Sequence, residues 1–204
     1  MGKINRHIML LLTALSVAVV AQAQTTDKAA GYMRRLAAAM ESMEAYTVDF
    51  TASAGDDDRI GGRYEVAGRR YHINIAGNEV YGDDELRREV DAAHREIVVD
   101  AADTTGRNLL TNPTRGFRFI GDDYRPRLDS ETESSIVVTL TPTATDAAGM
   151  ITVTLGKSDM LPKQIQYSTE GEIVTIVIES IAKGASLPVF DAANYPDYEI
   201  IDFR

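Results

Sequence analysis

The sequence predicts an α+β fold, in which one amphipathic helix leads into a long antiparallel sheet. Three observations predict it. Apolar residues recur at helical spacing over residues 27–44, short period-two runs follow from residue 46 onward, and turn residues separate these runs every eight to twelve positions. Such spacing is typical of an antiparallel meander and not of a parallel α/β sheet. We expect a single domain over residues 24–204, because a chain of this length suits one core.

The helix is predicted from apolar residues that recur at steps of four, four and three and therefore share one face: Tyr32, Leu36, Met40 and Met43. Charged residues occupy the other side: Lys28, Arg34, Arg35 and Glu41. We expect the helix to begin near Asp27, with Thr25 or Thr26 as its cap.

The first strand is a period-two run over residues 46–52, which predicts a buried face of Tyr46, Val48, Phe50 and Ala52. Further short strands are expected over residues 60–66, 69–75, 79–81, 86–90 and 97–99. The apolar face continues on the next two of these through Tyr64, Val66, Tyr71, Ile73 and Ile75. We expect His72, on the opposite side of its strand, to face solvent.

Residues 136–181 have the clearest strand pattern in the chain. Apolar residues alternate over 136–140 and 150–155, and a third strand is expected from 164–167 on through 172–181. Residues 173–178 are apolar on both faces, whereas an ordinary antiparallel strand has one wet face. We therefore expect a helix or a ligand to cover the second face.

Two segments depart from the strand pattern. Residues 101–129 show no clean period two, and we expect short helical segments near 104–112 and 116–120, the second possible also as an edge segment. A long irregular insertion is often a lid or binding loop, although a surface excursion without a role is equally open. The apolar residues of the C-terminal tail predict that it is tied to the fold: Phe190, Tyr195, Ile200, Ile201 and Phe203.

The N-terminus has the pattern of a cleavable export signal. Lys3 and Arg6 precede an apolar run over residues 8–20, and Ala21-Gln22-Ala23 is a small-x-small cleavage site. We expect a signal peptide over residues 1–23 and a periplasmic mature chain. The alternative, a membrane anchor, is disfavoured because about 20 apolar residues are needed to span a bilayer.

Charge and cysteine content exclude several classes of function. Without Lys3 and Arg6, 19 of the 21 basic residues remain against 31 acidic ones, a net charge of −12. A negative field repels nucleic acid and anionic membranes and favours a basic partner surface, unless it serves only solubility. The absence of cysteine excludes disulfides, thiol chemistry and a lipid-modified cysteine. We expect a monomer that is not itself membrane-anchored and binds no nucleic acid.

No catalytic or metal-binding pattern is present. His72 and His94 lack partners at zinc-site spacing, and the acidic runs at residues 56–58 and 122–123 lack the alternating oxygen spacing of a calcium loop. There is no nucleophile elbow and no phosphate-binding loop. Acidic pairs are plentiful, so a hydrolase with a carboxylate pair is an alternative, but a solvated acidic face explains them more simply. We expect no enzyme activity, no cofactor and no metal.

Several stretches, in this order, resemble the periplasmic outer-membrane lipoprotein carrier family with the LolA-like fold. Met40-x-x-Met43-x-x-Tyr46-x-Val48-x-Phe50 is similar to the family's start, and Gly62-Arg63-Tyr64-Glu65-Val66 to the strand after its first turn. Val80-Tyr81-Gly82-Asp83 resembles the V-x-D-G region, and Val138-Thr139-Leu140-Thr141-Pro142 the L-x-P strand. Leu161-Pro162-x-x-Ile165 and Ile201-Asp202-Phe203-Arg204 resemble the last two motifs. The resemblance covers nearly all of the mature chain.

The resemblance implies an incomplete β-barrel, formed by a curved antiparallel sheet and closed by helices around an apolar cavity. It also implies a carrier that takes lipoprotein acyl chains from an inner-membrane release complex to an outer-membrane acceptor. The apolar strands agree with this, because acyl chains need an aliphatic wall and little polar chemistry. The candidate wall residues are Phe50, Tyr64, Val66, Tyr71, Ile73, Val138, Leu140, Val153, Ile176 and Ile178, with Leu109, Leu110 and Phe117 on the lid.

The sequence departs from the family pattern at two points. Where the family has an Arg-Pro whose arginine latches the lid, this chain has Ala67-Gly68-Arg69-Arg70, so Arg69 or Arg70 is the candidate latch. The tryptophan typical after the V-x-D-G region is absent, and Arg87 lies near its place. The alternative function is a sensor or interaction module of the same fold whose cavity is filled by its own helices.

Overall fold

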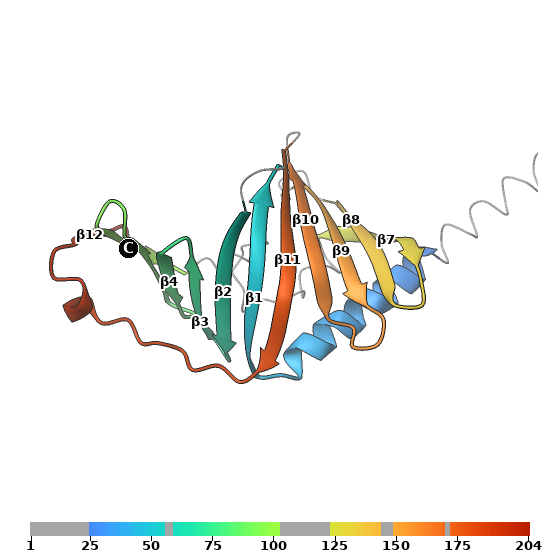
Figure 1. Cartoon of the computed structure of the whole chain (residues 1–204), viewed down its shortest axis with the longest axis horizontal. Coiled ribbons are helices and arrows are strands. Elements are labelled where there is room, and N and C mark those ends of the chain that lie inside the picture. The colour runs from blue at the N-terminus through green and yellow to red at the C-terminus, as the bar shows by residue number, and fades with distance from the viewer. Residues whose placement is uncertain (1–24, 56–58, 103–122, 144–148, 170–171) are drawn as a thin grey trace, which may run out of the picture.

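The computed structural model describes residues 25–55, 59–102, 123–143, 149–169 and 172–204. This part of the chain forms one 12-stranded sheet with an α-helix, residues 25–41, against one face (Figure 1). The strands in chain order are β1 (Ala45–Ala54), β2 (Arg59–Ala67), β3 (Arg70–Ile75), β4 (Asn78–Gly82), β5 (Leu86–Asp91), β6 (Glu96–Ala101), β7 (Tyr124–Glu131), β8 (Ser135–Pro142), β9 (Met150–Gly156), β10 (Pro162–Thr169), β11 (Glu172–Lys183) and β12 (Glu199–Asp202).

The sheet is open. Its order is β12-β6-β5-β4-β3-β2-β1-β11-β10-β9-β8-β7, so β12 and β7 are its two edges. All neighbours pair antiparallel except β12, which pairs parallel with β6. This confirms the predicted antiparallel sheet and the incomplete barrel in its coarse form. Closure by several helices is not seen in the described residues, where one α-helix and the 3₁₀ turn η3 (Ala192–Asn194) occur.

The helix buries three of the four predicted stripe residues, whereas Met43 lies in the turn after the helix and is partly buried. Tyr32, Leu36 and Met40 are buried, together with Ala29 and Met33, which complete an i, i+3, i+4 pattern on the same side. The described helix already includes residues 25 and 26, so the expectation that a threonine there caps it is wrong.

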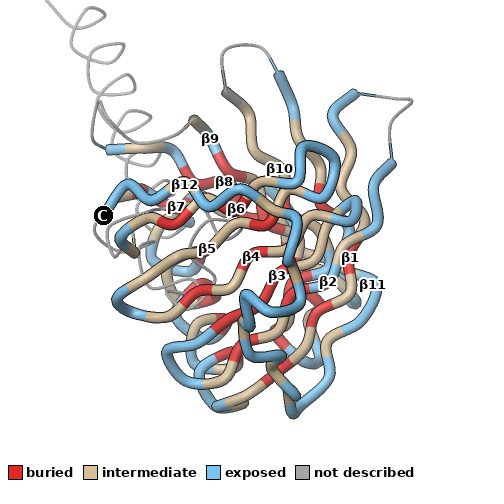
Figure 2. The backbone as a smooth tube through the Cα atoms, turned by 90° about the vertical axis from the view of Figure 1, so that its left-hand side faces the viewer, coloured by how far each residue is buried: buried red, intermediate tan, exposed pale blue. Residues whose placement is uncertain are grey.

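One face of the sheet, here called the inner face, packs against this helix. Its buried side chains from β1, β2, β3, β8, β9, β10 and β11 form a single cluster with the helix, whereas the turns that connect the strands are mostly exposed (Figure 2). Each strand contributes every second residue, because alternate side chains of a strand point to opposite faces. The predicted period-two faces of residues 46–50, 64–66 and 71–73 are therefore confirmed.

Two strand predictions need correction. The third strand expected over 164–181 is two strands, because the chain reverses between Thr169 and Glu172, which pair across β10 and β11. The segment 101–129 was expected to be irregular, but Tyr124–Glu131 is strand β7, with Pro126 and a bulge between Leu128 and Ser130 at the sheet edge. Proline and bulges are common on edge strands and disturb the period-two pattern, which is why the sequence did not indicate this strand.

The opposite, outer face differs from expectation on β11. Ile173 is 53% exposed and Val177 is 39% exposed, so nothing covers the second face of this strand among the described residues. The outer face is instead covered at β4, β5 and β6. Residues 184–198, here called the C-terminal strap, run from β11 across the sheet to β12 (Figure 1).

The strap packs aromatic residues over a second, smaller cluster. Val90, Ile97 and Val99 are buried there, with Phe190 and Tyr195 of the strap packed against them. The prediction that the C-terminal tail is tied to the fold agrees with this packing and with the pairing of β12. His72, expected to face solvent, is only 7% exposed, because Tyr81 of β4 lies against its ring on the outer face at 4.7 Å between ring centroids.

Candidate acyl-chain-binding face

The predicted wall residues that the structure describes lie together on the inner face. They belong to one cluster, in which all are buried except Ile178, which is partly buried: Phe50, Tyr64, Val66, Tyr71, Ile73, Val138, Leu140, Val153, Ile176 and Ile178. They come from β1, β2, β3, β8, β9 and β11. The three lid candidates, Leu109, Leu110 and Phe117, lie outside the described residues.

The register of the strands aligns one continuous aliphatic row across the inner face. The residues are paired in turn from β2 to β7: Ile60, Ala52, Ile176, Ile165, Val153, Val138 and Leu128. Exposure changes along the row, from 42% at Ile60 to 3% at Ile176 and 0% at Val153 and Val138. The row is therefore open to solvent at its β2 end and closed in the middle. Pairing with β3 begins at Gly62, so Ile60 lies beyond the end of that strand.

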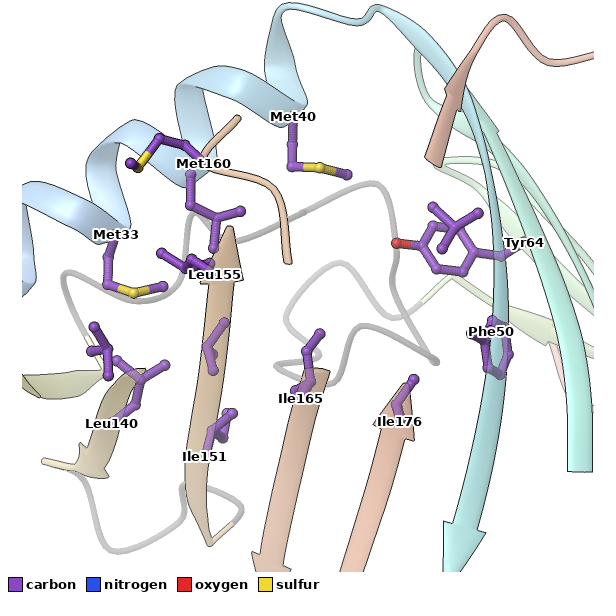
Figure 3. Close-up of a cluster of buried hydrophobic side chains, with 14 of the residues drawn as sticks. Met33, Met40, Phe50, Tyr64, Leu140, Ile151, Leu155, Met160, Ile165 and Ile176 are labelled. Atoms are coloured by element: carbon purple, nitrogen blue, oxygen red, sulfur yellow. The ribbon is translucent and has the colours of Figure 1, made fainter. Parts of the chain in front are cut away.

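The helix fills the β8 and β9 side of this face. Figure 3 shows Met33 and Met40 directed from the helix toward the sheet, above Leu140, Ile151 and Leu155. Ion pairs fix the N-terminal end of the helix to the sheet. Glu131 of β7 contacts Lys28 of the helix at 2.5 Å and Lys157 at 2.6 Å. Hydrogen bonds from Lys157 and Lys28 lower the pKa of Glu131 to about 2.

The β1 to β3 side of the face is aromatic. The ring of Tyr64 lies 6.2 Å from that of Tyr46, edge to face, and 6.1 Å from that of Phe50. Phe50 pairs with Gly62 across β1 and β2, and its ring lies over the glycine. Tyr71 pairs with Gly82 in the same way. Figure 3 shows Tyr64 and Phe50 on the opposite side of the cluster from Met33 and Leu140.

Two tyrosines of the described inner face, Tyr46 and Tyr64, are neutral near pH 7. Burial raises the pKa of Tyr46 to about 12 and that of Tyr64 well above its ordinary value, so both phenols stay neutral. A neutral face of aliphatic and aromatic side chains can exclude water from an apolar ligand.

The two candidate latch arginines have different surroundings. Arg69 is 77% exposed and forms an ion pair with Asp84, across the ends of β3 and β4. Arg70 is exposed at the start of β3 and lines a pocket on the outer face. The lid residues lie outside the described part of the chain, so the latch stays a prediction.

Several inner-face residues were absent from the predicted wall. Ile60, Ile165 and Met160 belong to the row or its border, and Met33 of the helix belongs to the same buried cluster as Ile165 and Met160. Ile165 could have been found, because it follows the same alternation as Tyr167 on β10. Met160 lies in a turn with a positive φ of 58°, and no periodic pattern predicts it.

An open antiparallel sheet with a helix on its apolar inner face is the architecture that the sequence resemblance implied. No helix in the described residues is long and apolar enough to cross a membrane. No protein-family model and no curated protein sequence matches the chain.

Comparison with solved structures gives related folds at low identity. An uncharacterized conserved protein from Thermus thermophilus aligns with a TM-score of 0.57 and 9% identity, over 86% of this chain and 99% of that protein. At this identity the two share the fold alone. The neighbours include a LolA superfamily protein from Nitrosomonas europaea, with a TM-score of 0.42 and 11% identity over 78% of this chain and 94% of the other. They also include the Pseudomonas aeruginosa MucA/MucB complex, with a TM-score of 0.49 and 15% identity over 79% of this chain and 59% of the other.

Proposed function

We propose that the mature chain, residues 24–204, is a monomeric periplasmic carrier that binds lipoprotein acyl chains on its inner face and carries them toward the outer membrane. The observation that supports this most directly is the aliphatic row from Ile60 to Leu128, which is open at one end and buried along its middle. The carrier acts by binding and not by catalysis, since the wall is neutral and apolar.

The dimensions of the row suit an acyl chain. Six inter-strand steps of about 4.8 Å give it a length of about 29 Å. One leaflet of a bilayer, by comparison, holds its acyl chains in about 15 Å, half of the hydrocarbon core. Each methylene buried on such a surface contributes about 0.8 kcal/mol, so a chain of ordinary length is held without polar contacts.

The methionines give the closed part of the row a means to open. Met33 and Met40 of the helix and Met160 beside β9 contact the same cluster. Methionine is unbranched and polarizable, so it re-packs around ligands of different shape at low cost. In this proposal an acyl chain enters over Ile60, and the helix side chains move aside as it advances toward Ile165.

An inner-membrane release complex and an outer-membrane acceptor are the partners that the family resemblance suggests. The acidic charge of the chain, −10 over the whole sequence, favours basic docking surfaces on both. Export by the signal peptide over residues 1–23 places the carrier between the two membranes.

A specific observation favours the second candidate function. Val138, Leu140 and Val153 are fully buried and in one cluster with Leu36 and Met40 of the helix. If this packing never opens, the chain is a sensor or interaction module whose inner face is filled by its own helix.

Native mass spectrometry of the mature protein with a diacylated lipopeptide, together with a thermal melt, distinguishes a carrier from an interaction module. A carrier binds one lipopeptide saturably, and its melting temperature rises because the ligand binds only the folded state. An unchanged mass and melting temperature would exclude the carrier and leave the interaction module.

Two substitutions test the row itself. Ile60→Asp places a charge at the exposed entrance, where the fold tolerates it, and should weaken binding at least tenfold. Ile176→Asp should abolish binding in the molecules that fold, because an unpaired carboxylate in an apolar site is costly. The matched control is Val177→Asp, next to Ile176 on the same strand but 39% exposed on the outer face. If Val177→Asp weakens binding as much as Ile60→Asp, the inner-face assignment is wrong.

A further inference from the structure

A pocket on the outer face, remote from the aliphatic row, has no role in the proposed carrier function. It has a volume of about 270 Å³ and lies between the strap and the sheet, where β3 begins and β4 ends. The sheet contributes Arg70, Tyr81, Asp83 and Arg88, and the strap contributes Pro188 and Phe190. In Figure 2 the strap passes in front of β3, β4 and β5.

Two guanidinium groups, those of Arg70 and Arg88, line this pocket. Among the described residues, neither Arg70 nor Arg88 forms an ion pair, whereas the neighbouring Arg69 is paired with Asp84. The Arg88 guanidinium lies 5.4 Å from the centroid of the Phe190 ring. A cation–π contact of this kind uses no hydrogen bond, so N–H groups of the Arg88 guanidinium stay available to an acceptor.

The acidic lining residue is already engaged by the turn between β4 and β5. Asp83 Oδ1 accepts hydrogen bonds from the backbone N–H groups of Glu85 and Leu86, each at 2.8 Å. Burial opposes ionisation of Asp83, but these bonds and the charge of Arg88 hold its pKa below the ordinary value. The pocket therefore carries one carboxylate held in place and two guanidinium groups, a net positive charge within an acidic protein.

The remaining walls are apolar and aromatic. The rings of Tyr81 and Phe190 meet edge to face at 5.6 Å, and Pro188 closes the strap side. A volume of about 270 Å³ lies just below the 300 to 1,000 Å³ usual for small-molecule sites. Such a pocket fits a compact molecule and is too small for a folded partner.

We propose that this pocket binds a small amphiphilic oxyanion, a single carboxylate or phosphate group on a compact aromatic or aliphatic body. The N–H edges of Arg70 and Arg88 hold the oxyanion, since a guanidinium matches two oxygens of such a group. The body of the ligand lies against Tyr81 and Phe190. Because Phe190 belongs to the strap and the arginines to the sheet, the bound ligand joins the two.

Isothermal titration calorimetry of the mature protein with phenyl phosphate and with phenylacetate tests the proposal. Phenylacetamide serves as the neutral analogue, and inorganic phosphate as the anion without an apolar body. At least one aromatic anion should bind one to one, and phenylacetamide and inorganic phosphate should each bind at least tenfold more weakly. Comparing the affinities of phenyl phosphate and phenylacetate shows whether the pocket prefers a phosphate or a carboxylate.

Arginine variants assign the binding to this pocket. Arg70→Ala and Arg88→Ala should each weaken binding about tenfold, the loss expected for one charge-assisted hydrogen bond. Arg69→Ala is the matched control and should bind as the parent does. Arg70 is exposed at the start of β3, and thermal melts of all three variants test whether the fold is kept. Failure of both aromatic anions to bind at millimolar concentration, equal binding of inorganic phosphate, or equal losses in Arg69→Ala and Arg70→Ala would overturn the proposal.

Discussion

Two glycines of the inner face make room for aromatic rings on the neighbouring strands. A Cβ atom at Gly62 would lie 2.4 Å from Cζ of Phe50, and one at Gly82 would lie 2.1 Å from Cζ of Tyr71. Rings cannot bend away as a flexible chain end does, so a side chain at either position displaces them. Glycine is therefore required here for space, and neither position has a positive φ.

Gly62→Ala should destabilise the fold by about 1 to 3 kcal/mol, the usual cost of overpacking a core. Gly61→Ala is the matched control, because the added Cβ meets nothing within 4 Å on the other face of the same strand. Urea unfolding of both variants measures the difference. Combining Gly62→Ala with Phe50→Leu should recover part of the loss that Gly62→Ala causes in the parent background. Equal stability of the two single variants would mean that the ring adjusts freely.

The strap is fixed to the sheet by one shared carboxylate. Glu79 of β4 accepts hydrogen bonds from the hydroxyl groups of Tyr81, at 2.5 Å, and of Tyr195 in the strap, at 2.8 Å. Burial alone would raise the pKa of Glu79, but these hydrogen bonds, with the charge of His72, hold it below its ordinary value of 4.5. The ionised carboxylate therefore stabilises the docked strap.

The stability that Glu79 contributes should depend on pH. Because its pKa is lower in the folded state, the contribution is complete above pH 4.5 and is lost as the pH falls through the folded value. The unfolding free energy of the parent minus that of Glu79→Gln should thus be largest near pH 7 and shrink below pH 4.5. Denaturant unfolding from pH 7 to pH 3 measures it. Tyr195→Phe, which removes one hydrogen-bond donor to Glu79, should reduce this pH dependence. If the difference in unfolding free energy between the parent and Glu79→Gln stays constant down to pH 3, the proposed role of Glu79 is wrong.

Across the whole molecule, the sheet changes the face that it buries. From β1 to β3 and from β8 to β11 the buried apolar side chains point to the inner face and its helix. On β5 and β6, Val90, Ile97 and Val99 are buried on the outer face instead, beneath the strap. One sheet thus has two separately covered surfaces, which keeps the proposed acyl-chain site and the oxyanion pocket apart.

The mature protein is expected to begin at Gln24. Expression of the full chain in a Gram-negative host should give a periplasmic product whose intact mass corresponds to cleavage after Ala23. Ala23→Arg should block cleavage, because small residues are required at this site, and should leave the precursor at the membrane. A soluble product that retains residues 1–23 would refute the signal peptide. Light scattering of the mature form should give the mass of a monomer.

The period-two alternation of residues 46–50, 64–66 and 71–73 was enough to predict which side chains share the inner face. Alternation is a property of the extended backbone, so it can be read without knowing the partners of a strand. For the same reason the helix stripe of Tyr32, Leu36 and Met40 could be predicted, together with most of the described wall residues of the candidate site. Figure 3 shows several of them converging as expected.

Residues whose surroundings come from distant parts of the chain could not be predicted in this way. His72 is buried by its neighbours on β2 and β4, and the outer face of β11 stays exposed although its sequence is apolar. The pocket between Arg70, Arg88 and Phe190 exists only because the strap returns over 100 residues later in the chain. The sequence by itself determined the helix, most of the strands and the apolar side of each, because these follow from local backbone geometry, whereas edge strand β7 and the division between β10 and β11 were missed. The tertiary structure alone decided what covers each face, because that depends on contacts between segments far apart in the chain.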